Sequence, residues 1–124
     1  INTRSISKDG GISTFRSSVV ITRNAPKSKA AVSCQSLMLD DISRSDTIPA
    51  MDIRTKDANV GHEAKIGKIS DDAVFYLMSR GIPEEDARAM IVSGFADNVS
   101  KELPLEYAVE MNNLIQLEMK GSIG

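Results

Sequence analysis

Apolar positions in the first half of the chain recur with the spacing and residue types of β-strands. β-Branched residues gather in short segments that clusters of turn-forming residues separate. These segments are 13–22, 31–39, 48–56 and 60–69. The dipeptide Asp9-Gly10 is typical of a tight hairpin. With no helical pattern between the strands, we expect a β-sandwich or a solenoid of stacked β-coils, and an ordinary antiparallel sheet is the commonest form of such a pattern.

The period of the apolar positions changes near Ser70, where helices are predicted. Ser70 precedes two acidic residues, which is typical of a helix start, and Gly81 is a suitable end. Pro83 and the acids after it begin a second helix, and Gly94 is a candidate early end for it. Residues at three- and four-residue spacing form the expected apolar face of this second helix: Ala87, Met90, Ile91 and Phe95.

A third helix is predicted from Pro104 to Lys120-Gly121. Its apolar sector is wider than packing on one neighbour requires, so the helix is either enclosed within its own domain or has one stripe that meets a partner. The sector comprises Leu105, Ala108, Val109, Met111, Leu114, Ile115, Leu117 and Met119. The predicted class is therefore α+β, with strands in residues 1–69 and a small helical domain in residues 70–124.

Composition and charge narrow the functional classes. The 124 residues are 41% apolar and 26% charged, which is normal for a globular domain or a piece of one. A net charge of −2 and the lack of a basic stripe argue against nucleic-acid binding, and no apolar run is long enough for a bilayer. A single cysteine excludes an internal disulfide and favours a reducing, intracellular setting. Because the first residue is Ile1, we expect a fragment or a processed piece.

Few residues could carry chemistry. The sequence has no phosphate-binding P-loop, dinucleotide fingerprint or nucleophile elbow, so we expect this chain to bind no nucleotide. Cys34, His62 and Glu63 remain, and singly each is most often structural. Together they are credible ligands for iron or zinc, although only one of His62 and Glu63 can share a strand face with Cys34. One Cys and one His cannot complete a four-ligand cluster, which indicates a site shared with a second chain at a subunit interface.

Several short motifs are distributed over nearly the whole chain. Cys34 lies in Ser-Cys-Gln-Ser-Leu, and Glu63 lies in Gly-His-Glu-Ala. The other motifs are residues 4–7, 15–16, 68–70, 75–82, 94–95, 102–110 and 120–124. In their sequence and order these motifs resemble the C-terminal part of SufB-type scaffold subunits, in the SufB/SufD family of the Suf iron–sulfur cluster assembly system. A Glu at position 63 favours SufB over SufD, in which Gly is usual there.

The resemblance implies a fold and partners. It implies a right-handed parallel β-helix segment followed by a small α-helical domain, which decides between sandwich and solenoid. A SufC-type ABC ATPase would dock on the C-terminal helices, and SufD or a second SufB-like subunit would pair through the β-helix. ATP-driven movement of SufC would rearrange the paired surface. The expected location is a bacterial or archaeal cytoplasm or a plastid stroma, without nucleic acid or membrane as a partner.

The resemblance also implies roles for individual residues. Cys34 would ligate a transient iron–sulfur cluster, Glu63 would act as a metal ligand or proton handler, and His62 would have a weaker part in holding the cluster. The family's sulfur-accepting cysteine lies earlier and is absent here. The chain is then a scaffold and not an enzyme. The alternatives are a SufD-like structural partner without a cluster ligand, an ATPase-docking module with an inert Cys34, and a self-contained metal-binding domain.

Overall fold

Five β-strands in two sheets make up the first part of the molecule. The computed structural model describes residues 1–120. The strands are β1 (Asn2–Ser7), β2 (Ile12–Ile21), β3 (Ser28–Met38), β4 (Arg44–Ile53) and β5 (Ala58–Lys68). One sheet has the order β1-β3-β5, and the other pairs β2 with β4. All three strand pairings are parallel, as the family resemblance implies, and the alternative of an ordinary antiparallel sheet is wrong.

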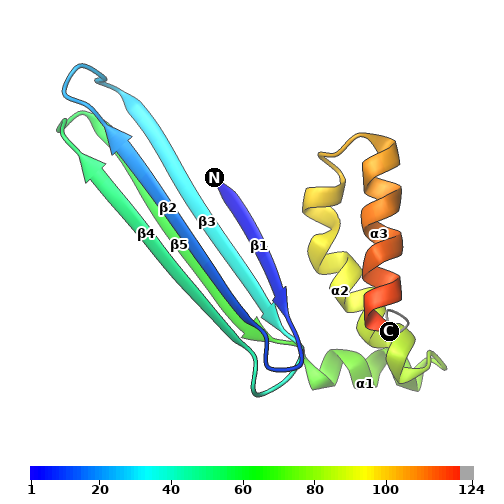
Figure 1. Cartoon of the computed structure of the whole chain (residues 1–124). Coiled ribbons are helices and arrows are strands. Elements are labelled where there is room, and N and C mark those ends of the chain that lie inside the picture. Colours follow the sequence, from blue (N-terminus) through cyan, green and yellow to red (C-terminus); the bar gives the residue numbers. More distant parts are fainter. Residues whose placement is uncertain (121–124) are drawn as a thin grey trace. The chain divides into compact units, whose positions relative to one another are not determined.

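Consecutive strands alternate between the two sheets. The arrowheads of β1, β3 and β5 point one way in Figure 1, and those of β2 and β4 point the other way. Residues paired across neighbouring strands are 31 positions apart for Asn2 and Ser33, and 30 for Ser28 and Ala58. Ile12 and Arg44 are 32 apart. The chain therefore returns to the same sheet about every thirty residues.

The turn at Asp9 and Gly10 reverses the chain without forming a hairpin. Both residues have positive φ, 54° and 77°, and the Gly11 amide donates to the Lys8 carbonyl at 2.9 Å. However, β1 pairs with β3 and β2 pairs with β4, so the hairpin interpretation is wrong. A turn sequence specifies a local reversal of direction, whereas the partner of a strand depends on the wider topology.

The interior between the strands combines a few apolar side chains with serine hydroxyl groups. Its buried apolar residues are Ile21, Val32, Cys34 and Leu39. Ser36 is also buried, and its hydroxyl accepts hydrogen bonds from Ser5 at 2.8 Å and Ser45 at 2.7 Å. These bonds satisfy hydroxyl groups that would otherwise be costly to remove from water.

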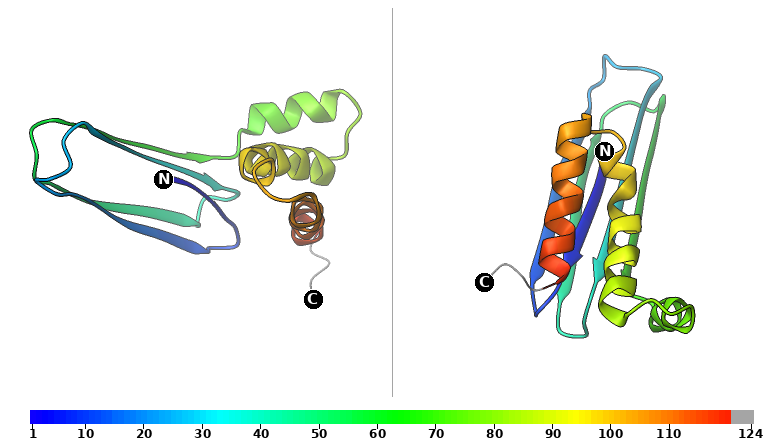
Figure 2. Two further views of the ribbon diagram at one scale, coloured as in Figure 1. Left: turned by 90° about the horizontal axis from the view of Figure 1, so that it is seen from above. Right: turned by 90° about the vertical axis from the view of Figure 1, so that its right-hand side faces the viewer.

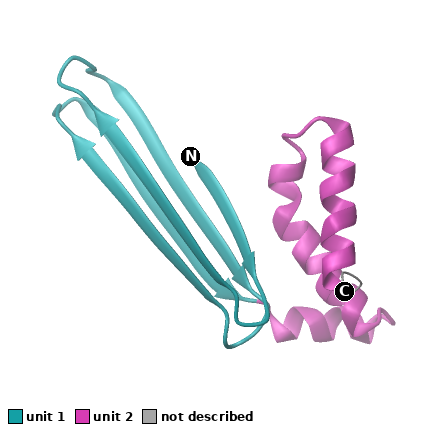
Figure 3. Cartoon of the chain, in the orientation of Figure 1, with its two compact units in different colours: residues 1–68 teal, residues 69–124 magenta. Residues whose placement is uncertain are grey.

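The second compact unit begins at Ile69 (Figure 3). Its helices are α1 (Asp71–Ser79), α2 (Glu84–Ser100) and α3 (Leu105–Met119). The Ser70 hydroxyl accepts from the Ala73 amide at 3.2 Å and so caps α1 as predicted. Gly81 follows the end of α1 with φ of 87°, a conformation that glycine adopts without strain.

Helix α2 differs from its prediction in length and in its buried face. It continues through Gly94 to Ser100, because Val92, Ala96 and Ser100 form a buried stripe at four-residue spacing. Met90, which was expected on the apolar face, is 51% exposed. Ala87 is buried as predicted, and the other buried residues of α2 are also small, including Ala89 and Ala96, which permits close helix packing.

Helix α3 lies beside α2, as two views show (Figures 1 and 2). The Gln116 side-chain amide donates to the Ser93 hydroxyl at 3.2 Å between them. No residue of α3 is fully buried, and Leu105, Val109 and Leu117 are among its exposed apolar residues. Lys120 caps the helix, whereas the predicted stop at Gly121 lies outside the described residues.

Candidate metal-ligand positions on the three-stranded sheet

Cys34 lies on β3, the central strand of its sheet. Along this strand Val32, Cys34 and Ser36 are buried, whereas Ser33 and Gln35 between them are partly exposed. The alternation puts the Cys34 side chain on the interior face of the sheet, because successive side chains point to opposite faces. Cys34 is only 2% exposed, so water and small reagents reach its thiol poorly in this form.

His62 and Glu63 lie on β5, the neighbouring strand. Val32 pairs with His62, Ser33 with Glu63, and Cys34 with Ala64. Paired residues on parallel strands present their side chains to the same face, so His62 shares the interior face with Cys34. Glu63 lies on the opposite face with Ser33. The structure therefore brings Cys34 and His62 to one face of the sheet and separates Glu63 from them.

The Glu63 carboxylate already has a cationic neighbour. Its Oε1 lies 3.0 Å from the Lys65 Nζ, two residues along the same strand and on the same face. Both side chains are largely exposed, so the pair contributes little to stability. A largely exposed carboxylate in a weak ion pair can release its partner for a metal ion at small cost.

The donor set on this sheet suits iron but is incomplete. A thiolate and an imidazole are both good ligands for iron and zinc. Among residues 1–120, no three His, Cys, Asp or Glu side chains form a group that could hold a metal ion. The Cys34 and His62 pair therefore cannot by itself complete the four-ligand site that structural zinc or a cluster requires.

Sequence reasoning missed the serine side chains near Cys34. Ser36 follows Cys34 on the same interior face, and its hydrogen bonds reach Ser5 on β1 and Ser45 on β4. The interior beyond the thiol is thus partly polar. The serines at every second position of residues 5–7 and 43–45 were the available signal, because such spacing places them on one strand face.

Comparison with known proteins decides the family. The family described as SUF system FeS cluster assembly, SufBD core domain, matches residues 1–95. The chain belongs to the SufBD family. This matched region contains all five strands, and with them Cys34, His62 and Glu63, whereas α3 lies beyond it.

Individual SufBD relatives agree with the family match. The chain is 51% identical over all its 124 residues to the iron–sulfur cluster assembly protein SufB of Bacillus subtilis. It is 51% identical to a SufBD family protein of Staphylococcus saprophyticus and 47% identical to one of Mycobacterium leprae, again over 124 residues. It spans 27% of the length of the first two relatives and 14% of the third.

Within residues 1–120, no helix of the SufBD chain combines the length and the apolar character that a membrane-spanning helix needs.

Proposed function

We propose that this chain is part of a scaffold subunit for Suf iron–sulfur cluster assembly, and that Cys34 ligates the nascent cluster. The family match carries the proposal, because it covers the strands on which Cys34, His62 and Glu63 lie. The chain would act without catalysing a reaction and without binding a nucleotide. The cluster is its cargo, assembled together with a partner subunit. The expected compartment is the cytoplasm, or a plastid stroma.

The need for a partner follows from the number of ligands. One thiolate and one imidazole on the interior face leave at least two positions of a four-ligand site open. The proposed source of the missing ligands is SufD or a second SufB-like subunit. Strand β5 supports this arrangement, because within residues 1–120 it pairs only with β3, and its residues from Gly61 to Lys68 are all exposed. An unpaired strand edge offers a row of backbone donors and acceptors to another chain.

Glu63 has a separate role in this proposal. Because it lies on the face opposite Cys34, it would handle protons or hold iron on the outer side of β5 before the cluster forms. Its ion pair with Lys65 would open during that step. His62 would be the weaker second ligand beside Cys34.

The burial of Cys34 requires the strands to move before iron can bind. A thiol that is 2% exposed must be uncovered, at least locally, when the cluster is built. We assign that movement to a SufC-type ABC ATPase, whose ATP-driven motion would be transmitted through the helices.

The β unit is proposed to be a segment of a right-handed parallel β-helix. The parallel pairings, the alternation of strands between two sheets and the return of the chain about every thirty residues support it. In such a coil each circuit stacks on the one before, so both sheets can be extended by neighbouring circuits.

The proposed docking helix for the ATPase is α3. Its half-buried residues Ala108, Met111 and Ile115 recur at the spacing of one helical stripe. Leu105, Val109 and Leu117 are exposed by 75%, 51% and 46%, and they supply a second apolar stripe for a partner. The first stripe would pack on α2, and the second would meet the ATPase.

A pull-down experiment tests the docking proposal. The full-length protein carrying Val109→Ser and Leu117→Ser should retain less than about a tenth of the co-purified SufC-type ATPase, because two apolar anchors are lost. Asn98→Ala changes an exposed polar residue of the neighbouring helix α2, outside this stripe, and should leave the yield unchanged. Undiminished ATPase binding by the Val109 and Leu117 variant, or by a protein lacking residues 83–124, would exclude docking on these helices.

The burial of Cys34 also favours a second candidate function. A SufD-like structural subunit would keep the same strands and helices but contribute no cluster ligand, with Cys34 as a small core residue. The two candidates differ in one property, because only the first needs the sulfur atom. Cluster assembly that survives Cys34→Ser would favour the structural role.

A further inference from the structure

Four basic side chains without ion-pair partners gather at one end of the β unit. Arg23 and Lys27 belong to the segment between β2 and β3, and Lys29 is the second residue of β3. Lys56 belongs to the turn between β4 and β5. No carboxylate lies within ion-pair distance of any of the four in the described part of the chain. Arg54, also at this end, is held by Asp52 at 2.5 Å. Among the described residues, Asp57 is then the one carboxylate at this end without a cationic partner.

The opposite end of the same strands is arranged differently. Lys8 pairs with Asp9, and Lys68 pairs with Asp41 at 2.7 Å. The Asp40 carboxylate accepts hydrogen bonds from backbone amides, including those of Asp9 and Ser43. Charged groups at that end are therefore paired or hydrogen-bonded within the chain, whereas the cluster of Arg23, Lys27, Lys29 and Lys56 keeps an excess positive charge. We call this cluster the basic end.

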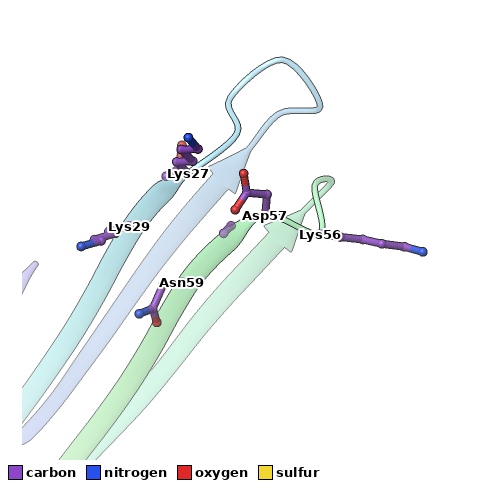
Figure 4. A pocket seen from close by; sticks show the side chains of 7 residues that line it. Lys27, Lys29, Lys56, Asp57 and Asn59 are labelled. Carbon is purple, nitrogen blue, oxygen red and sulfur yellow. The ribbon is translucent and has the colours of Figure 1, made fainter.

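The backbone holds the basic end together. The Lys27 amide donates to the Asp57 carbonyl at 2.6 Å and so ties the two turns to each other. Lys29 and Asn59 are paired residues of β3 and β5, and they share one face of the sheet. Lys27, Lys29, Asp57 and Asn59 help to line a hollow of about 270 Å³ (Figure 4).

Lys27 has an unusual backbone conformation for its residue type. Its φ is 60°, in the left-handed region that glycine and asparagine adopt more readily. A lysine in this conformation destabilises the folded chain more than glycine or asparagine would. No contact of its ammonium group within the described chain offsets that loss of stability. A cost of this kind is a reason to look for a role outside the chain's own packing.

We propose that the basic end binds an acidic segment of a partner protein, rich in Asp or Glu. Lys27 and Lys29 project from one side of this end and Lys56 from the opposite side (Figure 4), so the cations form an extended surface and do not converge on one small anion. Neither turn contains an aromatic residue on which nucleic-acid bases could stack. Carboxylates spaced along a peptide match separated lysines, which act as point charges.

A binding measurement with a defined probe tests this proposal. The probe is a fluorescein-labelled decaglutamate peptide, titrated at low salt with the full-length protein and followed by anisotropy. Lys27→Asn with Lys29→Gln and Lys56→Gln removes three charges and keeps a residue suited to the backbone at position 27. Because three exposed ion contacts are lost and each is individually weak, we expect binding to weaken about tenfold.

Two matched variants serve as controls. Lys8→Gln with Lys101→Gln and Lys120→Gln removes three charges that are paired with Asp9, Asp97 and Asp86, and should change the affinity less than about twofold. Replacing Lys27, Lys29 and Lys56 by arginine keeps the charge and should preserve binding.

Three results would overturn the proposal. The first is undetectable binding of decaglutamate to the wild type, or an affinity that is unchanged in the Lys27, Lys29 and Lys56 variant. The second is tighter binding of a short oligothymidine, which would indicate a nucleic-acid partner. The third is displacement of the peptide by inorganic phosphate at constant ionic strength, which would indicate a site for one small anion. None of these readouts involves iron, so they are independent of the proposed cluster function.

Discussion

Cys34 and Glu63 lie on neighbouring strands of one sheet but face opposite sides of it. The pairing of Cys34 with Ala64 puts Glu63 one position out of phase with the thiol, and Glu63 instead pairs with Ser33. His62, which pairs with Val32, is the residue that shares the thiol's face. A single metal ion held within this sheet therefore cannot take both Cys34 and Glu63 as ligands without rearrangement of β5.

The burial of Cys34 predicts slow reaction of its thiol. With 2% of the residue exposed, labelling by a thiol-specific disulfide reagent must wait for local opening of the strands. We expect the native chain to react on the order of a hundredfold more slowly than the same chain unfolded in guanidinium. Stopped-flow absorbance measures both rates on a protein in which Cys34 is the only cysteine. Native labelling as fast as that of the unfolded chain would show that the thiol is open.

Removing the side-chain cap at the start of α1 should lower the stability of the protein measurably. Ser70→Ala removes the hydroxyl that accepts from the Ala73 amide and should reduce the free energy of unfolding by about 1 kcal/mol. Ser70→Asp keeps an acceptor at the cap and should retain most of the stability. Urea unfolding followed by circular dichroism gives both values. Equal stability of the alanine and aspartate variants would show that the cap contributes nothing.

The hydrogen bonds of the Asp40 carboxylate should make the stability of the protein depend on pH. Desolvation acts to raise the pKa of this carboxyl, but hydrogen bonds from Ser43 and from the Ile42 and Asp9 amides outweigh it and lower the pKa overall. A carboxyl whose pKa is lowered by folding stabilises the protein above its unfolded pKa of about 3.9. That stabilisation is lost as pH falls through the lower, folded pKa.

The matching measurement compares thermal midpoints of the wild type and Asp40→Asn. The wild type should have the higher midpoint near neutral pH, and the difference should shrink as the solution is acidified to about pH 3. Asp46→Asn is a control, because Asp46 makes only an exposed ion pair with Arg44. A difference that stays constant with pH would contradict the role given to the charged form of Asp40.

Local features of the fold could be predicted from the sequence, whereas the pairing of strands could not. β-Branched segments and turn residues located β2 to β5 to within a few residues, and Ser70 marked the start of α1. Strand β1 has only one apolar residue, Ile6, so it has no alternating pattern and forms through its pairing with β3. Parallel pairing is set by residues about thirty positions apart, which a turn motif such as Asp9-Gly10 does not specify.

The arrangement of the candidate site could likewise be predicted only in part from the sequence. The alternation rule predicted that only one residue of His62 and Glu63 could share a face with Cys34, but the choice needed the register of β3 against β5. The exposure of Met90 on α2 and the small residues buried in its place also depend on the neighbouring helices. Chemistry-bearing residue types are visible in a sequence, whereas their common face is a property of the packed strands.

Anaerobic cluster reconstitution in the full-length protein with its partners tests the central claim most directly. Iron content and visible charge-transfer absorption would be compared for the wild type, Cys34→Ser and the control Gln35→Ala, which changes the adjacent residue on the other face of β3. We predict that Cys34→Ser loses most of the bound iron and absorption while Gln35→Ala keeps both. A Cys34→Ser protein that assembles a cluster with wild-type iron content would contradict the account.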